Sequence, residues 1–408
     1  MKKMSGRYIL VLIAMCGLAA ASVGLTTNVA GLFFTPISEE FNILRGSVSM
    51  TLTICNLMFA IGGLAAPKLL SEKNLRKLLI IGVVLIAGGT ALLGVSNGIM
   101  MMYVLNAIRG FATGILGFVL ITMVINHWFQ ANVALMTSIA MSCSGLASAL
   151  FSPIISSVIE SAGWRTGYFV VAVLMTLLIL PSILFLPSLD PHTKDIKAYG
   201  EQETVQNDAQ KTNEDTSISP VSVSLLVMVI IYAFMACGAT ALPQHFPAIS
   251  TSYMLEATTG ALMLSICMIA NSAGKIILGA MVDKLGTKLS VLIYLCLTIG
   301  GALMLLLIHM PFSMYIAAAL FGLTYALGSV GVVTITKDMF GLANYGKTYP
   351  TISLAGTIAN ALFSSLIGFM YDFSGNYNGT LIMMIAMLVT AICMVIVVYT
   401  IKAKKQTV

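Results

Sequence analysis

Charged residues are scarce in this chain. Asp, Glu, Lys and Arg make up 9% of its 408 residues, whereas 58% of the residues are hydrophobic. Soluble proteins carry roughly 25% charged residues, so a chain this poor in charge has too few of them to build a water-facing surface. The composition excludes a water-soluble protein and indicates a chain that lies in a lipid bilayer.

Acidic side chains are missing from the interior of the apolar segments. The fifteen Asp and Glu residues all fall in polar loops or at the ends of apolar runs, so no buried carboxylate is available as a proton relay. The seven cysteines are an odd number without a CxxC pair, and all fall inside apolar runs. This pattern gives neither a disulfide framework nor a metal site. We expect no metal and no cofactor.

Long apolar runs, in contrast, dominate the chain. A helix needs about 20 residues to cross the roughly 30 Å of hydrocarbon in a bilayer. Lipid offers no partners for free backbone groups, so such runs must be helical. Twelve runs qualify: 8–34, 46–66, 77–96, 99–125, 133–157, 167–187, 221–242, 257–281, 288–309, 311–335, 348–371 and 378–401. The predicted fold is therefore an all-α membrane protein with twelve transmembrane helices.

Lys and Arg are distributed unevenly along the chain. With the N-terminus in the cytosol, fourteen of them lie in cytosolic loops and tails, and only Arg45 and Arg165 face outward. This bias predicts a multi-pass plasma-membrane protein with both termini in the cytosol. The net charge of +6 is then a signal of orientation and gives no support to a nucleic-acid partner. The basic face also suits the anionic headgroups of the bilayer.

One polar stretch divides the chain into two related halves. Residues 188–220 are rich in acids and predict a flexible cytosolic linker between an N-terminal half, 1–187, and a C-terminal half, 221–408. The sequence ALFS at 149–152 recurs at 361–364, and glycines repeat at the same offset of 212. The chain is therefore a duplicated six-helix unit. Transporters built from such repeats bind their substrate at the repeat interface, near the membrane midplane.

Three motifs resemble those of the major facilitator superfamily. The stretch 279–286, GAMVDKLG, is similar to its cytosolic-loop signature, and Arg109 with Gly114 and Gly117 is similar to its Arg-then-glycine motif. The stretch 145–165 resembles its fifth helix and the exit from it. The resemblance covers essentially the whole chain and implies two pseudosymmetric six-helix halves. The first-half loop at 63–68 departs from the pattern because it lacks the aspartate.

Within the superfamily, the eighth helix resembles that of the oxalate/formate antiporters and monocarboxylate carriers. The stretch 271–275, NSAGK, places Lys275 where those families carry a substrate-binding arginine. The resemblance implies that Lys275 pairs with the negative group of the substrate. It also implies that Phe321, Tyr325 and Tyr349 occupy the aromatic positions that enclose oxalate in its antiporter.

Three departures from those families argue against oxalate itself. Lysine at 275 gives a point charge where arginine would grip a planar carboxylate with two hydrogen bonds. Ile352 stands where the oxalate antiporter has a second cavity lysine. Asn271, one helical turn before Lys275, stands where monocarboxylate carriers have an aspartate.

Each cation within an apolar run has two interpretations. A charge at a helix centre costs at least ~2.5–3.5 kcal/mol and often marks a substrate pathway. Arg109 is either a second positive contact for the substrate or a structural arginine that holds the outer end of the fourth helix. Lys275 either faces the cavity or extends to the cytosolic interface. Asn28, in the first run, either lines the pathway or bonds between helices.

The predicted function is transport of a small organic anion, a monocarboxylate or dicarboxylate, by alternating access in a monomer. The missing carboxylates favour exchange or facilitated flux, and coupling to protons stays open. Asp283 and Lys284, with the basic loop at 68–77, are expected to close the cytosolic gate through ion pairs between the halves.

Other functions fit the sequence less well. The alternative within transport is proton-driven efflux of drugs or of anionic amphiphiles such as bile acids. A receptor or sensor would need a signalling domain, for which the 188–220 linker is too short. An enzyme is not expected, because the apolar runs contain no nucleophile–base or metal constellation.

Overall fold

The described part of the chain is almost entirely helical. The computed structural model describes residues 6–131, 133–186, 188–194, 196–200, 222–308 and 310–406. Within these ranges, strand pairing is limited to an isolated bridge between Phe129 and Tyr199.

The first half contains α1 (Gly6–Ala19), η1 (Ala20–Leu25), η2 (Ala30–Phe33), α2 (Phe34–Phe41), α3 (Arg45–Leu69), α4 (Leu75–Val83), η3 (Val84–Gly88), α5 (Gly89–Gly94), α6 (Ile99–Gly114), η4 (Ile115–Val119), α7 (Leu120–Trp128) and α8 (Val133–Phe185). After η5 (Pro191–Lys194), the second half contains α9 (Val223–Ala239), η6 (Leu242–His245), α10 (Phe246–Ser252), α11 (Ala257–Leu285), α12 (Thr287–Leu307), α13 (Pro311–Gly322), α14 (Thr324–Ala326), η7 (Leu327–Gly331), α15 (Val332–Ser374) and α16 (Asn378–Gln406).

The prediction of twelve transmembrane helices is confirmed. The described residues form 11 helical segments that are long and apolar enough to cross a membrane, and the segment Leu135–Phe185 has 51 residues. Such a helix would be roughly 75 Å long, more than twice the hydrocarbon thickness. It breaks at Gly163, where φ is +82° and ψ is 160°, and so provides two crossings.

The internal repeat is visible in the geometry. Gly163 ends the fifth crossing with a positive φ, and Gly375, 212 positions later, ends the eleventh with a φ of +72°. An added Cβ on Gly110 would lie 2.2 Å from the Cys55 carbonyl oxygen, and one on Gly322 would lie 2.4 Å from that of Cys267. Both members of this second pair also lie 212 positions after those of the first. The two six-helix halves therefore pack their second and fourth helices by the same close backbone approach.

A pair of π-helical turns repeats at the same offset. The turn η4 interrupts the fourth crossing and η7 interrupts the tenth, and each spans five residues. A π turn widens the helix, frees a backbone carbonyl and occurs often at functional sites. In η7, the Leu327 carbonyl accepts a hydrogen bond from the Tyr232 hydroxyl at 3.3 Å.

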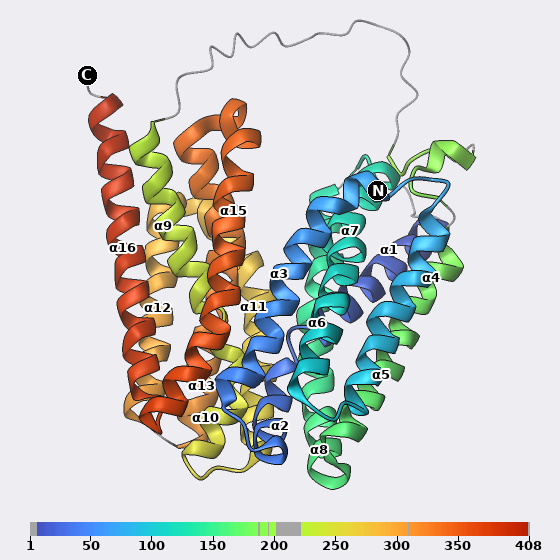
Figure 1. The fold of residues 1–408 in the computed structure, drawn as a ribbon. Coiled ribbons are helices and arrows are strands. Elements are labelled where there is room, and N and C mark those ends of the chain that lie inside the picture. The colour runs from blue at the N-terminus through green and yellow to red at the C-terminus, as the bar shows by residue number, and fades with distance from the viewer. Residues whose placement is uncertain are drawn as a thin grey trace, which may run out of the picture.

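The two halves stand side by side with both termini on one face, which we call the terminal face (Figure 1). On the opposite face, which we call the far face, α2 and α10 lie close together and the halves converge (Figure 1). The buried apolar side chains of both halves belong to one continuous cluster, and α3 and α8 contact α15 and α11 across the interface.

The first part of the predicted linker is anchored to the first half. Trp128 Nε1 donates to the Ser188 carbonyl at 3.1 Å, and the Tyr8 hydroxyl donates to the Lys197 carbonyl at 2.8 Å. The Glu72 carboxylate accepts the backbone N–H groups of Leu189 and Asp190. The remainder of the predicted linker, 201–220, lies outside the described residues.

Candidate functional site

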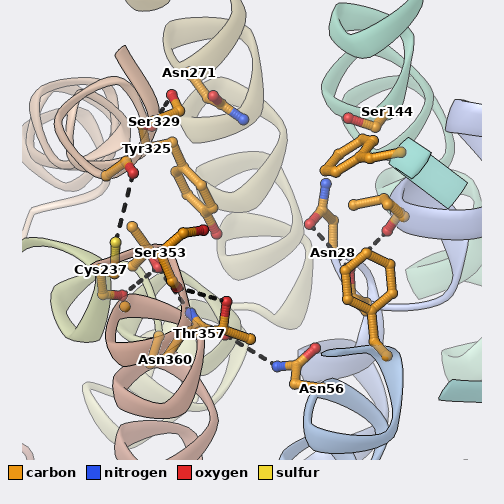
Figure 2. A pocket seen from close by; sticks show the side chains of 18 of the residues that line it. Asn28, Asn56, Ser144, Cys237, Asn271, Tyr325, Ser329, Ser353, Thr357 and Asn360 are labelled. Carbon is orange, nitrogen blue, oxygen red and sulfur yellow. Dashed lines mark hydrogen bonds between the residues drawn. The ribbon is translucent and has the colours of Figure 1, made fainter. Parts of the chain in front are cut away.

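A cavity of about 310 Å³ lies between the two halves. Its wall combines residues of the first half with a larger number from the second, and Figure 2 shows Asn28 on one side and Tyr325 and Asn271 on the other. The lining residues are Val23, Thr27, Asn28, Leu52, Asn56, Phe59, Phe118, Ser144, Cys237, Thr240, Ala241, Gln244, Asn271, Lys275, Tyr325, Gly328, Ser329, Val332, Tyr349, Ser353, Gly356, Thr357, Asn360 and Ser364.

Irregular backbone shapes this cavity. The turn η7 contributes Gly328 and Ser329 to the wall, and the turn η4 contributes Phe118 on the other side. The first crossing is broken between η1 and η2, and the residues in this break include Asn28. Non-helical backbone at membrane depth is tolerated where it lines a cavity or is buried in protein, so these interruptions mark the interior of the bundle.

Lys275 is the charged residue of the wall. No Asp, Glu, Arg or His is among the lining residues, and no hydrogen bond or ion pair joins Lys275 to another described residue. It projects from α11, is half-buried, and lies on the face of the helix that meets the other half. The structure therefore presents an ammonium group to the cavity without a compensating charge from the described chain.

Asn271 lies one turn before Lys275 on the same helix face. Its amide oxygen is buried without a hydrogen-bond partner, and its Nδ2 donates a long hydrogen bond to the Met268 sulfur, at 3.9 Å. Asn28 approaches from the first half, where its amide oxygen accepts a hydrogen bond from Thr27 at 3.4 Å. Both side-chain amides therefore have free hydrogen-bonding groups that can bind a solute.

Tyr325 and Tyr349 line the second-half wall of the cavity. Tyr325 lines the cavity together with Gln244 of η6. The Tyr349 ring stacks on Tyr345 with a centroid distance of 4.9 Å. The two tyrosines thus offer aromatic rings and hydroxyl groups to the cavity.

The structure places Arg109 and Phe321 away from this cavity. Arg109 is 3% exposed and lies inside the first half, beside Asn106 and Tyr168. Phe321 is fully buried inside the second half, with its ring edge-on to Phe246 at 6.3 Å. Both residues directly precede a glycine that packs on the neighbouring second or eighth helix, so each points into its own bundle rather than between the bundles.

A polar layer that no motif in the sequence indicated closes one end of the cavity. Asn56 Nδ2 donates to Asn360 Oδ1 at 3.0 Å across the halves, and Asn360 Nδ2 donates to Thr240 Oγ1 at 2.7 Å (Figure 2). Gln244 Oε1 accepts the Gly31 N–H at 3.3 Å, also across the halves. The sequence alone does not identify these residues as part of a cavity, because polar residues in apolar runs also form hydrogen bonds between helices.

The comparison with known families fits this architecture. A family model described as Major Facilitator Superfamily matches residues 16–242 and 225–407, which together cover most of the chain. The chain belongs to the Major Facilitator Superfamily. Membership makes this facilitator a transport protein that crosses the membrane many times.

Similar proteins support the same assignment. The facilitator is 24% identical over 388 residues to the uncharacterized MFS-type transporter YcxA of Bacillus subtilis (strain 168), covering 90% of this chain and 86% of that one. A bacterial homologue of the human lysosomal transporter Spinster superposes with a TM-score of 0.67 at 13% identity, covering 97% and 98% of the two chains. A point mutant of the nucleoside transporter NupG gives 0.68 at 14% identity, with 96% and 99% covered. These two structures show the fold alone.

The facilitator is closed at its far face by contacts between the halves. Asp372 at the end of α15 accepts the backbone N–H groups of Arg45 at 3.0 Å and Gly46 at 2.7 Å, which form the N-terminus of α3. The Arg45 guanidinium lies 4.2 Å from the centroid of the Tyr371 ring. A carboxylate is favoured at a helix N-terminus by the free N–H groups and the helix dipole. Asp372 is therefore a clamp on this closed face.

The predicted gating residues lie at the other end. Asp283 and Lys284 are exposed at the end of α11, on the terminal face. Neither makes an ion pair with another described residue, whereas Arg165 and Glu40 pair at 2.8 Å near the far face. The expected ion pairs across the halves are not formed in this conformation, where the far face is the closed one.

Proposed function

We propose that this facilitator carries a small organic anion through the cavity between its halves, with Lys275 as its charge contact. The observation that carries the proposal is the uncompensated ammonium group in a wall that contains no carboxylate among its described residues. Leaving a charge unpaired in a partly buried cavity is costly, and a bound carboxylate would supply the missing partner. Asn271, Asn28, Tyr325 and Tyr349 surround the space in which that carboxylate would lie.

The charge count favours a monocarboxylate over a dicarboxylate. One cation in the wall matches one carboxylate, and a second carboxylate would face amides and hydroxyls only. Those groups, including Asn56, Asn360 and Thr240, suit hydroxyl or carbonyl oxygens on the same substrate. The cavity volume of about 310 Å³ is at the lower end of the range for small-molecule sites. A small, polar monocarboxylate fits these constraints.

Exchange or facilitated flux suits this cavity better than proton coupling through the protein. No carboxylate or histidine is among the lining residues, so the described wall offers neither of these groups as a proton relay. A proton can still cross on the substrate itself. Because the cavity is complete within one chain, a monomer is the proposed working unit.

A second candidate substrate is an anionic amphiphile such as a bile acid. Phe59 and Phe118 meet edge-to-face at 6.3 Å on the first-half wall, beside Val23 and Leu52. This apolar surface opposite Lys275 would accept a ring system whose carboxylate contacts the ammonium group. Transport of a bile acid in preference to small carboxylates would favour this candidate.

We also propose that both termini face the cytosol in the plasma membrane. Their position on one face and the Lys and Arg bias support this orientation. Epitope tags at the two ends, tested for antibody access in intact and in permeabilised cells, should both require permeabilisation. Access to either tag in intact cells would reverse the orientation.

Counterflow in proteoliposomes tests the proposed substrate class. Vesicles preloaded with an unlabelled compound are mixed with the same compound in radiolabelled form, for oxalate, formate, lactate, pyruvate and a bile acid. A nucleoside serves as the neutral comparison, because one of the similar structures is a nucleoside transporter. Saturable accumulation of lactate or pyruvate is expected. Accumulation of the nucleoside without any anion would refute the proposal.

A further inference from the structure

A second, small cavity lies inside the first half, separate from the site between the halves. It has a volume of about 20 Å³, which is enough for one water-sized species. Nine of its fourteen lining residues are apolar, and the polar groups are contributed by Thr26, Thr51, Asn106, Arg109 and Tyr168. No acidic residue is among those that line it.

The guanidinium of Arg109 at this cavity is buried and incompletely bonded. Arg109 is 3% exposed, its Nη1 donates to Asn106 Oδ1 at 2.9 Å, and its Nε is buried without a partner. Among the described residues, Arg165 is the cation that makes an ion pair, and Arg109 makes none. A fully buried charge without a counter-charge is among the most costly arrangements in a protein.

The surrounding structure holds this side chain in place. An added Cβ on Gly89 would lie 2.9 Å from Arg109 Cγ, so the stem of the arginine runs directly over that backbone. Tyr168 is fixed by stacking on Phe33, with ring centroids 4.0 Å apart. The Tyr168 hydroxyl makes no hydrogen bond with another described residue, and Tyr168 lines the same cavity as Arg109.

The remaining polar groups leave the cavity rich in donors. The hydroxyls of Thr26 and Thr51 already donate to the carbonyls of Ala21 and Val48, at 3.1 Å and 2.6 Å. The unused donors therefore include the Nε–H and the other free N–H groups of the Arg109 guanidinium, together with the Tyr168 O–H. A cation and a hydroxyl donor around a space of one water fit a compact anion, which would supply the missing negative charge.

We propose that this cavity binds a single small anion of halide size between Arg109 and Tyr168. The site is independent of the cavity that holds Lys275 and of the identity of the transported solute. With the anion bound, Arg109 stabilises the packing of the first half and does not contact the substrate. Chloride is the probe with which to test it.

Thermal unfolding of the purified facilitator measures this binding. Sodium chloride and sodium bromide should raise the midpoint saturably above that in sodium gluconate at equal ionic strength. The same halide shift should persist in Lys275→Gln, and Tyr168→Phe should weaken the apparent halide affinity on the order of tenfold, because it removes one donor to a charged ligand. Arg109→Gln should abolish the shift.

Two results would overturn the proposal. Identical unfolding midpoints in chloride and gluconate for the wild type would mean that water or the nearby Cys55 thiol, and no anion, interacts with the free N–H groups of Arg109. A halide shift that is lost in Lys275→Gln but kept in Tyr168→Phe would place the anion in the central cavity. If Arg109→Gln does not fold, the anomalous signal of bromide in a crystal of the wild type decides, with a peak beside Arg109 expected and its absence refuting the site.

Discussion

Asp372→Asn should open the far face of the facilitator. The carboxylate receives two backbone N–H groups, from Arg45 at 3.0 Å and Gly46 at 2.7 Å, at the start of α3 in the other half. Hydrogen bonds to a charged group contribute about 1.5–3 kcal/mol each, and a charge at a helix N-terminus adds about 0.3–1 kcal/mol. Asparagine keeps one neutral acceptor and turns an NH₂ group toward the second N–H.

The substitution should therefore cost the closed far face about 2 kcal/mol, which corresponds to roughly a 30-fold change in the ratio of closed to open molecules. The clamp lies entirely between the halves, so the folded state of each half should be unaffected. The open population is the quantity to measure, because it rises in proportion to this change while closed molecules still predominate.

Labelling of an introduced thiol reports that population. Ser365 is 7% exposed, and its hydroxyl lies 2.5 Å from that of Thr53 in the other half, so Ser365→Cys places a thiol within the closed interface. A membrane-impermeant maleimide added to intact cells should modify this thiol up to about 30-fold faster in the Asp372→Asn background. Site-specific mass spectrometry separates it from the native cysteines.

A matched control is available in the second half. Asp338 accepts the Tyr399 hydroxyl at 2.7 Å, a contact that does not cross between the halves. Asp338→Asn should leave the labelling rate unchanged. A rate in Asp372→Asn within twofold of the parent would refute the idea that this carboxylate clamps the far face.

Two further outcomes follow from the packing. Gly322→Ala should lower the thermal unfolding midpoint by an amount equivalent to about 1–3 kcal/mol, because its methyl group would lie 2.4 Å from the Cys267 carbonyl oxygen. Gly300→Ala is the control, because its added Cβ meets nothing within 4 Å. Equal unfolding midpoints for the two variants would contradict the packing argument. Glu72→Ala should release the anchored start of the linker and raise the rate of trypsin cleavage at Lys194 on the order of fivefold, since it removes both carboxylate acceptors. Glu256→Ala should leave the cleavage rate unchanged. Unchanged cleavage in Glu72→Ala would show that the hydrogen bonds from Trp128 and Tyr8 hold the segment without Glu72.

The number of crossings and the twofold organisation could be predicted from the sequence because both depend on composition over long windows. Runs of about 20 apolar residues must span the bilayer as helices whatever their neighbours. The offset of 212 was readable in the glycines, and the structure shows why it persists: Gly110 and Gly322 meet equivalent carbonyls. Lys275 and Asn271 lie on one helix face because they are four residues apart.

The position of Arg109 was not predictable in the same way. Hydropathy shows that a residue is inside the membrane, but it does not distinguish the interior of one half from the space between the halves. That choice depends on helix phase, and Gly110, the next residue, is the one that faces α3. The π turns η4 and η7 change this phase further along the same helices, and no periodic pattern in the sequence locates them.

The amide layer could not be predicted because it is made by distant residues. Asn56 and Asn360 are 304 positions apart, and each alone resembles any polar residue that bonds between helices. The irregular η6 positions Gln244, whose side chain lies in the cavity wall together with Tyr325. Only the packing of the two halves identifies these residues as part of the cavity wall.

The charge of Lys275 is the most direct test of the proposed transport of an organic anion. Counterflow of the best-accumulated anion should be compared among the wild type, Lys275→Gln, Lys275→Arg and Lys347→Gln, with equal amounts of each reconstituted. We expect Lys275→Gln to lower kcat/KM about 10- to 100-fold, Lys275→Arg to retain part of it, and Lys347→Gln, at an exposed position outside the cavity, to match the wild type. Undiminished anion counterflow in Lys275→Gln would contradict the account.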